Sequence, residues 1–124
     1  MQILINNNKT IAKVQEEFSD AYPWLKLEFF AKPSKVGGMA SKKLIRNTGT
    51  TLGECRSIHA NGNLTITPDM TVGNLLQSFM DVYGLSVKLL RKSGKSWINT
   101  SLTESWTLEE QNSQGESLSA EAAE

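Results

Sequence analysis

The sequence predicts a small α+β protein built from two tandem strand–helix–strand repeats. The first observation behind this prediction is internal similarity. Residues 10–32 and 71–92 carry matching residues at a spacing of 61 positions, which falls to 60 after Pro23-Trp24. The second observation is that each copy changes from the period of a helix to the alternation of a strand. The matched pairs are Thr10/Thr71, Ile11/Val72, Val14/Leu75, Phe18/Phe79, Asp20/Asp81, Tyr22/Tyr83, Leu25/Leu85, Leu27/Val87, Phe29/Leu89 and Lys32/Lys92.

The first repeat begins with a short Ile-rich strand at residues 2–6, which the following asparagines end. Thr10 is placed to cap a helix, because its hydroxyl can accept from a free backbone N–H of the first turn. Pro23 ends the helix, since proline disfavours helical backbone at the residue before it. The apolar stripe of this helix is Ile11, Val14, Phe18 and Tyr22, and the next strand buries Leu25, Leu27 and Phe29.

The segment between the repeats is the least periodic part of the chain. Residues 42–45 are expected to form a short strand, and residues 51–54, Thr-Leu-Gly-Glu, a capped single turn. Asn61-Gly62 is the preferred pair for a type I′ turn. It predicts a hairpin between residues 56–60 and 63–67.

The second repeat restarts with a strand at residues 64–67, and Asp69 or Thr71 caps its helix. Gly84 is suited to end the helix, and Ser93-Gly94 to turn the next strand into a hairpin with residues 96–100. From residue 112 the composition is Ser, Glu, Gln and Ala, which predicts the disordered end of the chain. We therefore expect one compact domain at residues 1–115, with repeats at about 1–54 and 56–112, and a disordered acidic tail at 116–124. The helix buries Val72, Leu75, Leu76, Phe79, Met80 and Tyr83, and the strand buries Leu85, Val87 and Leu89.

The order of elements in each repeat resembles the β-grasp fold of ubiquitin-like proteins. Residues 107–110, Thr-Leu-Glu-Glu, are similar to the turn that follows the fourth strand in that family. This resemblance implies a sheet wrapped around one helix. The chain has no Gly-Gly terminus, so the resemblance does not imply a conjugated modifier. The alternative is a ferredoxin-like α/β sandwich, which is also made of two strand–helix–strand copies.

No motif of catalysis, cofactor binding or metal binding meets its requirements. Gly94-Lys95-Ser96 is similar to the end of a P-loop, but Leu89 occupies the position of its first glycine. Cys55 and His59 are too few for a zinc site. Asp20 and Asp81 are expected to be solvated helix carboxylates, because unpaired Asp is rarely buried. We expect no catalytic residue, no cofactor and no metal.

The basic residues predict a binding surface. Nine of the 13 basic residues fall in two stretches without acids, at corresponding places of the repeats, and Trp97 follows the second stretch. We expect a non-catalytic interaction module that binds a protein partner, with nucleic-acid binding through the two basic loops as the alternative. A second alternative is a small-molecule enzyme with a site between the repeats. The candidate binding surface is Lys32, Lys35, Lys42, Lys43, Arg46, Lys88, Arg91, Lys92, Lys95 and Trp97.

Composition sets the expected location of the protein. The formal net charge is zero, so overall charge does not indicate nucleic acid or an anionic membrane as a partner. The single Cys55 cannot form an internal disulfide, and no secretory signal or membrane-spanning run is visible. We expect a cytoplasmic protein without membrane contact, whose sheet edges also allow oligomers.

Overall fold

The computed structural model of the chain confirms an α+β fold. It describes the backbone of residues 1–31, 34–36, 39–41 and 43–122, and the side chains of residues 1–31 and 43–120. The strands are β1 (Gln2–Ile5), β2 (Leu25–Phe30), β3 (Ser34–Val36), β4 (Met39–Ser41), β5 (Gly62–Thr65), β6 (Ser86–Ser93) and β7 (Ser96–Asn99). The helices are α1 (Ile11–Ala21), α2 (Leu52–Cys55), α3 (Val72–Tyr83), the 3₁₀ turn η1 (Ser101–Thr103) and α4 (Leu108–Ala122).

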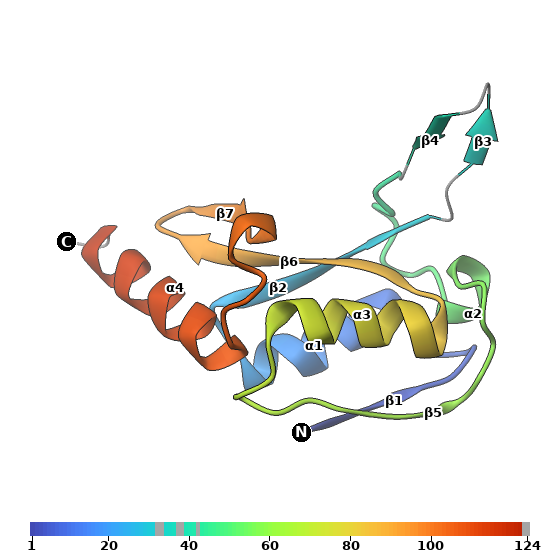
Figure 1. Cartoon of the computed structure of the whole chain (residues 1–124), viewed down its shortest axis with the longest axis horizontal. Coiled ribbons are helices and arrows are strands. Elements are labelled where there is room, and N and C mark those ends of the chain that lie inside the picture. Colours follow the sequence, from blue (N-terminus) through green and yellow to red (C-terminus); the bar gives the residue numbers. More distant parts are fainter. Residues whose placement is uncertain (32–33, 37–38, 42, 123–124) are drawn as a thin grey trace.

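The elements form three layers. Strands β2, β6 and β7 make an antiparallel sheet, and β1 and β5 make a separate antiparallel ribbon. Helices α1 and α3 lie between this sheet and the ribbon, and α4 lies beside the sheet at the β6–β7 end (Figure 1). A single hydrophobic core joins the layers, because buried residues of both helices, the ribbon and the sheet belong to one cluster.

The sequence signals at the helix ends are confirmed. The Thr10 hydroxyl accepts from Lys13 N at 3.2 Å, and the Thr71 hydroxyl accepts from Asn74 N at 3.2 Å. Gly84 ends α3 with a left-handed φ of 64°. The buried face of α3 is narrower than predicted, since Leu76 is only partly buried and Met80 is 37% exposed.

The two ladders between the halves of the chain share one geometric property. In β1–β5, Ile3 lies opposite Leu64, which stands 61 positions later. In β2–β6, Glu28 lies opposite Lys88, which stands 60 positions later. Each strand therefore pairs with the strand at the matching place of the other half, as in the self-complementary interface of a two-fold dimer.

The predicted hairpin at Asn61-Gly62 is wrong. Gly62 is the first residue of β5 and lies opposite Ile5 of β1, while residues 56–61 form no strand. Strand β5, which the local turn signal assigned to a hairpin, pairs instead with β1, which is distant in the sequence. The hairpin that supported the β-grasp resemblance is therefore not formed. The ferredoxin-like alternative also differs from the structure, because the strands flanking α1 and α3 divide between two sheets.

The predicted β6–β7 hairpin is formed, whereas the strand predicted at residues 42–45 is reduced to a bridge at Leu44, and Lys42 lies outside the described residues. The β6–β7 hairpin turns at Gly94-Lys95, one residue after the predicted Ser93-Gly94, and Lys92 lies opposite Trp97. At the other edge, Ala31 N donates to Lys43 O at 2.8 Å and Ile45 N donates to Phe29 O at 2.9 Å. Residues 43–45 thus extend the sheet next to β2, and the β3–β4 hairpin projects beyond them (Figure 1).

Part of the predicted disordered tail is helical. Helix α4 continues to Ala122 and so includes residues 116–122 of that tail, while residues 123–124 lie outside the described part. Contacts near its start anchor α4, since Leu108 and Gln111 are buried and Asn112 Oδ1 accepts from Trp24 N at 2.9 Å. Composition alone missed this docking. None of the helices in the described ranges is long and apolar enough to cross a membrane.

Candidate functional site

The outer face of the sheet is the surface where the predicted binding residues gather. The helices cover the face that carries Leu25, Leu27 and Phe29, so the alternate residues of each strand face away from the core. This outer sheet face carries three lysines and one acid. It consists of Lys26, Glu28 and Phe30 from β2, Lys88, Leu90 and Lys92 from β6, and Trp97 and Asn99 from β7.

Aromatic rings hold the lysines of this face against the sheet. The Lys92 and Lys26 ammonium groups lie 5.1 and 5.8 Å from the centre of the Trp97 ring. The Lys88 ammonium lies 5.1 Å from the centre of the Phe30 ring. Exposed contacts of this kind contribute about 0.5–1 kcal/mol each, enough to restrict where the charges sit. The outer sheet face is therefore positive and partly preorganised.

Several predicted site residues lie together on or beside this face. Lys88, Lys92 and Trp97 belong to it, and Lys95 is exposed in the β6–β7 turn. Lys43 and Arg46 are exposed at the opposite edge, beyond β2. Lys32 and Lys42 lie outside the described residues, and only the backbone of Lys35, in β3, is described.

Arg91 does not join this surface. It lies opposite Leu25, on the core side of β6, where its Nη1 donates to Gln111 Oε1 at 2.9 Å. Its guanidinium also lies 5.5 Å from the centre of the Trp106 ring. These contacts hold α4 against the sheet, so Arg91 has a structural role and does not contribute to the outer sheet face.

Sequence reasoning missed Lys26 and Phe30 as members of the outer sheet face. Both positions alternate with the buried Leu25, Leu27 and Phe29, and this alternation was the signal that could have found them. Counting charges between acids instead selected Arg91, whose side chain points to the other side.

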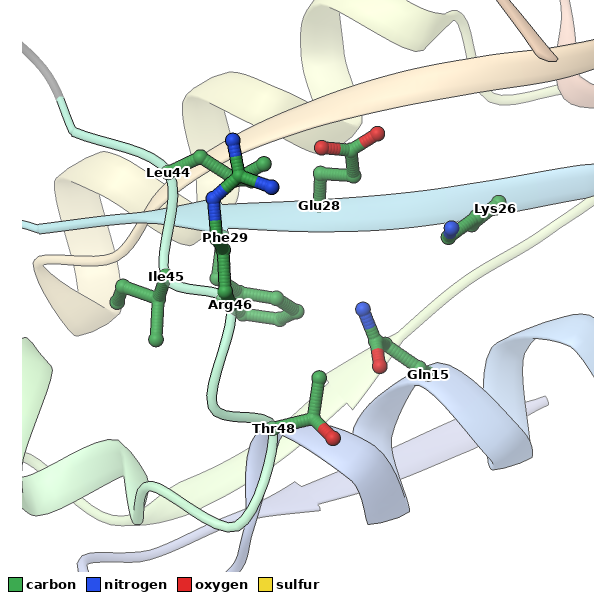
Figure 2. Close-up of a pocket in the computed structure, with 8 residues that line it drawn as sticks. All are labelled: Gln15, Lys26, Glu28, Phe29, Leu44, Ile45, Arg46 and Thr48. Carbon is green, nitrogen blue, oxygen red and sulfur yellow. The ribbon is translucent and has the colours of Figure 1, made fainter.

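A groove of about 310 Å³ lies at the edge of β2 that faces away from β6. Gln15 reaches it from α1, while Leu44, Arg46 and Thr48 come from the segment that leaves the sheet edge (Figure 2). Gln15 Nε2 donates to Leu27 O at 2.8 Å, and Ser19 Oγ donates to Leu25 O at 3.1 Å. The side chains of α1 thus cap the backbone oxygens at this edge. We call this hollow the first groove.

A groove of about 300 Å³ lies at the matching place of the second half. Leu76 and Met80 of α3 line it, and they stand 61 positions after Gln15 and Ser19. The rest of the lining of this second groove is Gly73 and Gln77 of α3, residues 85–88 and Glu104. At positions 76 and 80 the second half has a leucine and a methionine where the first half has a glutamine and a serine.

The remaining polar candidates have structural environments. His59 is exposed and its Nδ1 lies 3.0 Å from Asn7 Oδ1, while Cys55 is buried. No group of metal ligands occurs among the described residues. Asp20 and Asp81 are exposed, as predicted, and neither lines the first or second groove.

Arg56 is the fully buried cation of the described core. Its guanidinium donates to Asn7 Oδ1, to Ala60 O at 2.6 Å and to Asn61 Oδ1 at 3.2 Å. Burial lowers the pKa of Arg56. The hydrogen bonds from Arg56 to neutral oxygens of both halves therefore hold in place the segment that connects the two halves.

Two other groups titrate away from their ordinary values. Burial, and then the charges of Asp69 and Glu109, raise the pKa of Tyr22. Hydrogen bonds from the Thr51 backbone and hydroxyl lower the pKa of the Glu54 carboxyl. Both groups belong to the scaffold.

Comparison with models of protein families, with curated proteins and with solved structures finds no match for this chain.

Proposed function

We propose that this protein is a non-catalytic interaction module that binds an acidic segment of a partner protein through its outer sheet face. The observation that carries this proposal is the gathering of Lys26, Lys88 and Lys92 around Trp97 and Phe30, with Glu28 as the single acid among them. Complementary charge speeds association and selects partners. An exposed tryptophan supplies apolar contact area of the kind enriched at interfaces.

Nucleic-acid binding is the second candidate, since lysines beside an aromatic ring also suit phosphates and bases. The protein partner ranks first for two reasons. The net charge of the chain is zero, whereas nucleic-acid-binding domains are usually basic. A base stacked on Trp97 would also have to share the ring with the ammonium groups of Lys26 and Lys92.

The same proposal has the protein act in the cytoplasm, because a sequence with one cysteine cannot form an internal disulfide, which suits a reducing compartment. An enzymatic role has no comparable support. Neither groove is lined by Asp20 or Asp81, the carboxylates for which acid–base work was considered.

Calorimetric titration of the full chain with a glutamate-rich peptide and with a single-stranded polynucleotide tests the proposal. We expect the peptide to bind, and Lys92→Glu or Trp97→Ala to weaken binding by about tenfold or more. Lys13→Glu is the matched control, because Lys13 is an exposed lysine on α1, away from the sheet face, and it should leave affinity nearly unchanged. Added salt should weaken the binding.

Two results would contradict the proposal. One is the absence of peptide binding at low salt. The other is polynucleotide binding that is tighter than peptide binding and lost in the same variants, which would establish the second candidate instead.

A further inference from the structure

Among the described residues, no strand lies beside the edge of β6 that faces the second groove, since β7 pairs with β6 only from Leu90 onward. Leu89 O accepts from Thr100 N at 3.3 Å and from the Thr100 hydroxyl at 2.9 Å. The N–H and C=O groups of Leu89 and of every second residue from it along β6 therefore face the β7 side. After Thr100 the chain turns away into η1. Val87 lies two residues before Leu89 and its N–H and C=O therefore point to the same side, into the open edge.

No described residue donates to or accepts from these Val87 groups. In the first half the matching oxygen is Leu27 O, which Gln15 caps at 2.8 Å, and Ser19 caps Leu25 O at 3.1 Å. The matching helix positions are Leu76 and Met80, and neither side chain can donate a conventional hydrogen bond. The two halves thus share one edge geometry, but only the first half closes it with its own side chains.

We infer that the second groove is a strand-addition site, in which an extended segment of the acidic partner pairs with β6 through Val87. This inference rests on the proposed function and specifies how that partner binds. An open sheet edge recognises an extended peptide through its backbone, and the flanking pockets select every second side chain.

The walls of the groove define the side chains of the bound segment. Successive residues of an added strand point to opposite faces of the sheet. On the core side they would contact Leu76 and Met80, which is 37% exposed, so apolar residues are favoured there, while Glu104 lies beside Gly73 at the start of α3. On the other side they would lie next to Lys88, which is exposed and continuous with the outer sheet face, so acidic residues are favoured. The segment therefore alternates apolar and acidic residues.

A short synthetic peptide in which valine and glutamate alternate is the probe. We expect it to bind the full chain, to protect the Val87 amide from hydrogen exchange and to shift the amide signals of residues 86–88. The same peptide with N-methyl groups on its edge-facing amides should bind about tenfold more weakly or not at all, because it cannot pair with the strand. Solution NMR and calorimetry report both effects.

The double variant Leu76→Gln plus Met80→Ser copies the capped edge of the first half onto the second. It should lose the peptide by about tenfold or more while keeping its thermal unfolding midpoint close to that of the parent. Val82→Ser is the matched control, because Val82 is a 50% exposed apolar residue of the same helix that does not line the groove. The single variant Val87→Pro is an independent check, since it removes an N–H that points away from the β2 ladder.

Each contrary result has its own meaning. Peptide binding that leaves the Val87 amide unprotected and survives in the double variant overturns the strand-addition site, while the acidic partner on the outer sheet face stands. Failure of both this peptide and the glutamate-rich peptide to bind removes the proposed function as well. Protection of Val87 that rises with protein concentration in the absence of peptide overturns the inference in favour of a second copy of the chain at this edge.

Discussion

Glu28 and Lys88 lie directly opposite each other in the β2–β6 ladder, although they occupy the same position of the two halves. When a strand pairs antiparallel with its own counterpart, a residue lies opposite its equivalent only at the centre of the ladder, so an unchanged residue there would face a copy of itself. Two like charges in this position destabilise an antiparallel pair. The opposite charges at positions 28 and 88 remove that repulsion at the centre of the ladder.

Reversing one of these charges restores the repulsion. Glu28→Lys should lower the free energy of unfolding by about 0.2–1 kcal/mol, less at high salt, because two lysines then face each other. The double exchange Glu28→Lys plus Lys88→Glu should recover most of the loss. Urea unfolding at low and high salt measures both changes, and an additive double variant would show that the two residues do not interact.

Phe79 tests the buried face of α3. It is fully buried and its ring meets the Phe29 ring edge-on, with centroids 6.0 Å apart. Phe79→Ala should cost about 3–5 kcal/mol, from lost transfer energy and the cavity left behind. Leu102→Ala is the control, because Leu102 is 98% exposed and its loss should change stability by less than about 0.5 kcal/mol. Denaturant midpoints that shift equally in both variants would contradict the core assignment.

Gly84 and Gly73 should respond in opposite directions to alanine. At Gly84, φ is 64° and an added Cβ would lie 2.4 Å from Ile58 N, so Gly84→Ala should cost more than about 1 kcal/mol. Gly73 lies in the first turn of α3, and an added Cβ would lie 3.5 Å from Glu104 O, an ordinary contact. Gly73→Ala should stabilise by up to about 1 kcal/mol. Thermal unfolding of the two variants compares them directly, and a tolerated Gly84→Ala would contradict the close approach.

Arg56 tests how the two halves are connected. Lysine cannot reproduce the contacts that the guanidinium makes with Asn7, Ala60 and Asn61, so Arg56→Lys leaves a buried cation with fewer hydrogen bonds. We expect a loss of about 1–3 kcal/mol or more in unfolding free energy. Arg46→Lys, at an exposed arginine, should be close to neutral. If the two variants unfold alike, the buried contacts of Arg56 do not contribute to stability.

Glu54 gives a pH dependence with a defined sign. The pKa of its carboxyl is lowered in the folded protein, so its ionised form stabilises the fold. This stabilisation is complete above the ordinary pKa of a glutamate, about 4.3. It is lost as the pH falls through the lower folded value. The difference in unfolding midpoint between the parent and Glu54→Gln should therefore shrink as the pH drops below about 4.3. A difference that stays constant with pH would show that the charge of Glu54 is not responsible.

Helices α1 and α3 could be predicted from sequence because their signals are local. The caps at Thr10 and Thr71, the left-handed Gly84 and the alternation in β2 and β6 all lie within a few residues of the element they define. Strand partners could not be predicted in the same way. The local sequence at Asn61-Gly62 favours a hairpin for β5, whereas in the fold β5 pairs with β1. The pairing of strands about 60 residues apart in the sequence depends on burial of the whole sheet face, which cannot be predicted from a local pattern.

The candidate site was predicted in part for the same reason. Charge counting found Lys88, Lys92 and Trp97, whose grouping survives in the fold. Charge counting could not show that Arg91 lies on the core side of the sheet, because the face on which a strand residue lies depends on the register of the strand. The second groove was invisible in sequence. It depends on Leu76 and Val87 lying side by side and on the turn after Thr100.

The pairing of each strand with its counterpart also governs the order of events during synthesis. When the ribosome has completed the first half, β1 has no ribbon partner and β2 can pair only with residues 43–45. The apolar side chains of the first half stay without their cover until β5, α3 and β6 emerge, so the nascent chain must wait for its second half to close the core. Such a chain gains little from folding as it is made. Its β2–β6 ladder can form only after β6, which ends at Ser93, has left the ribosome.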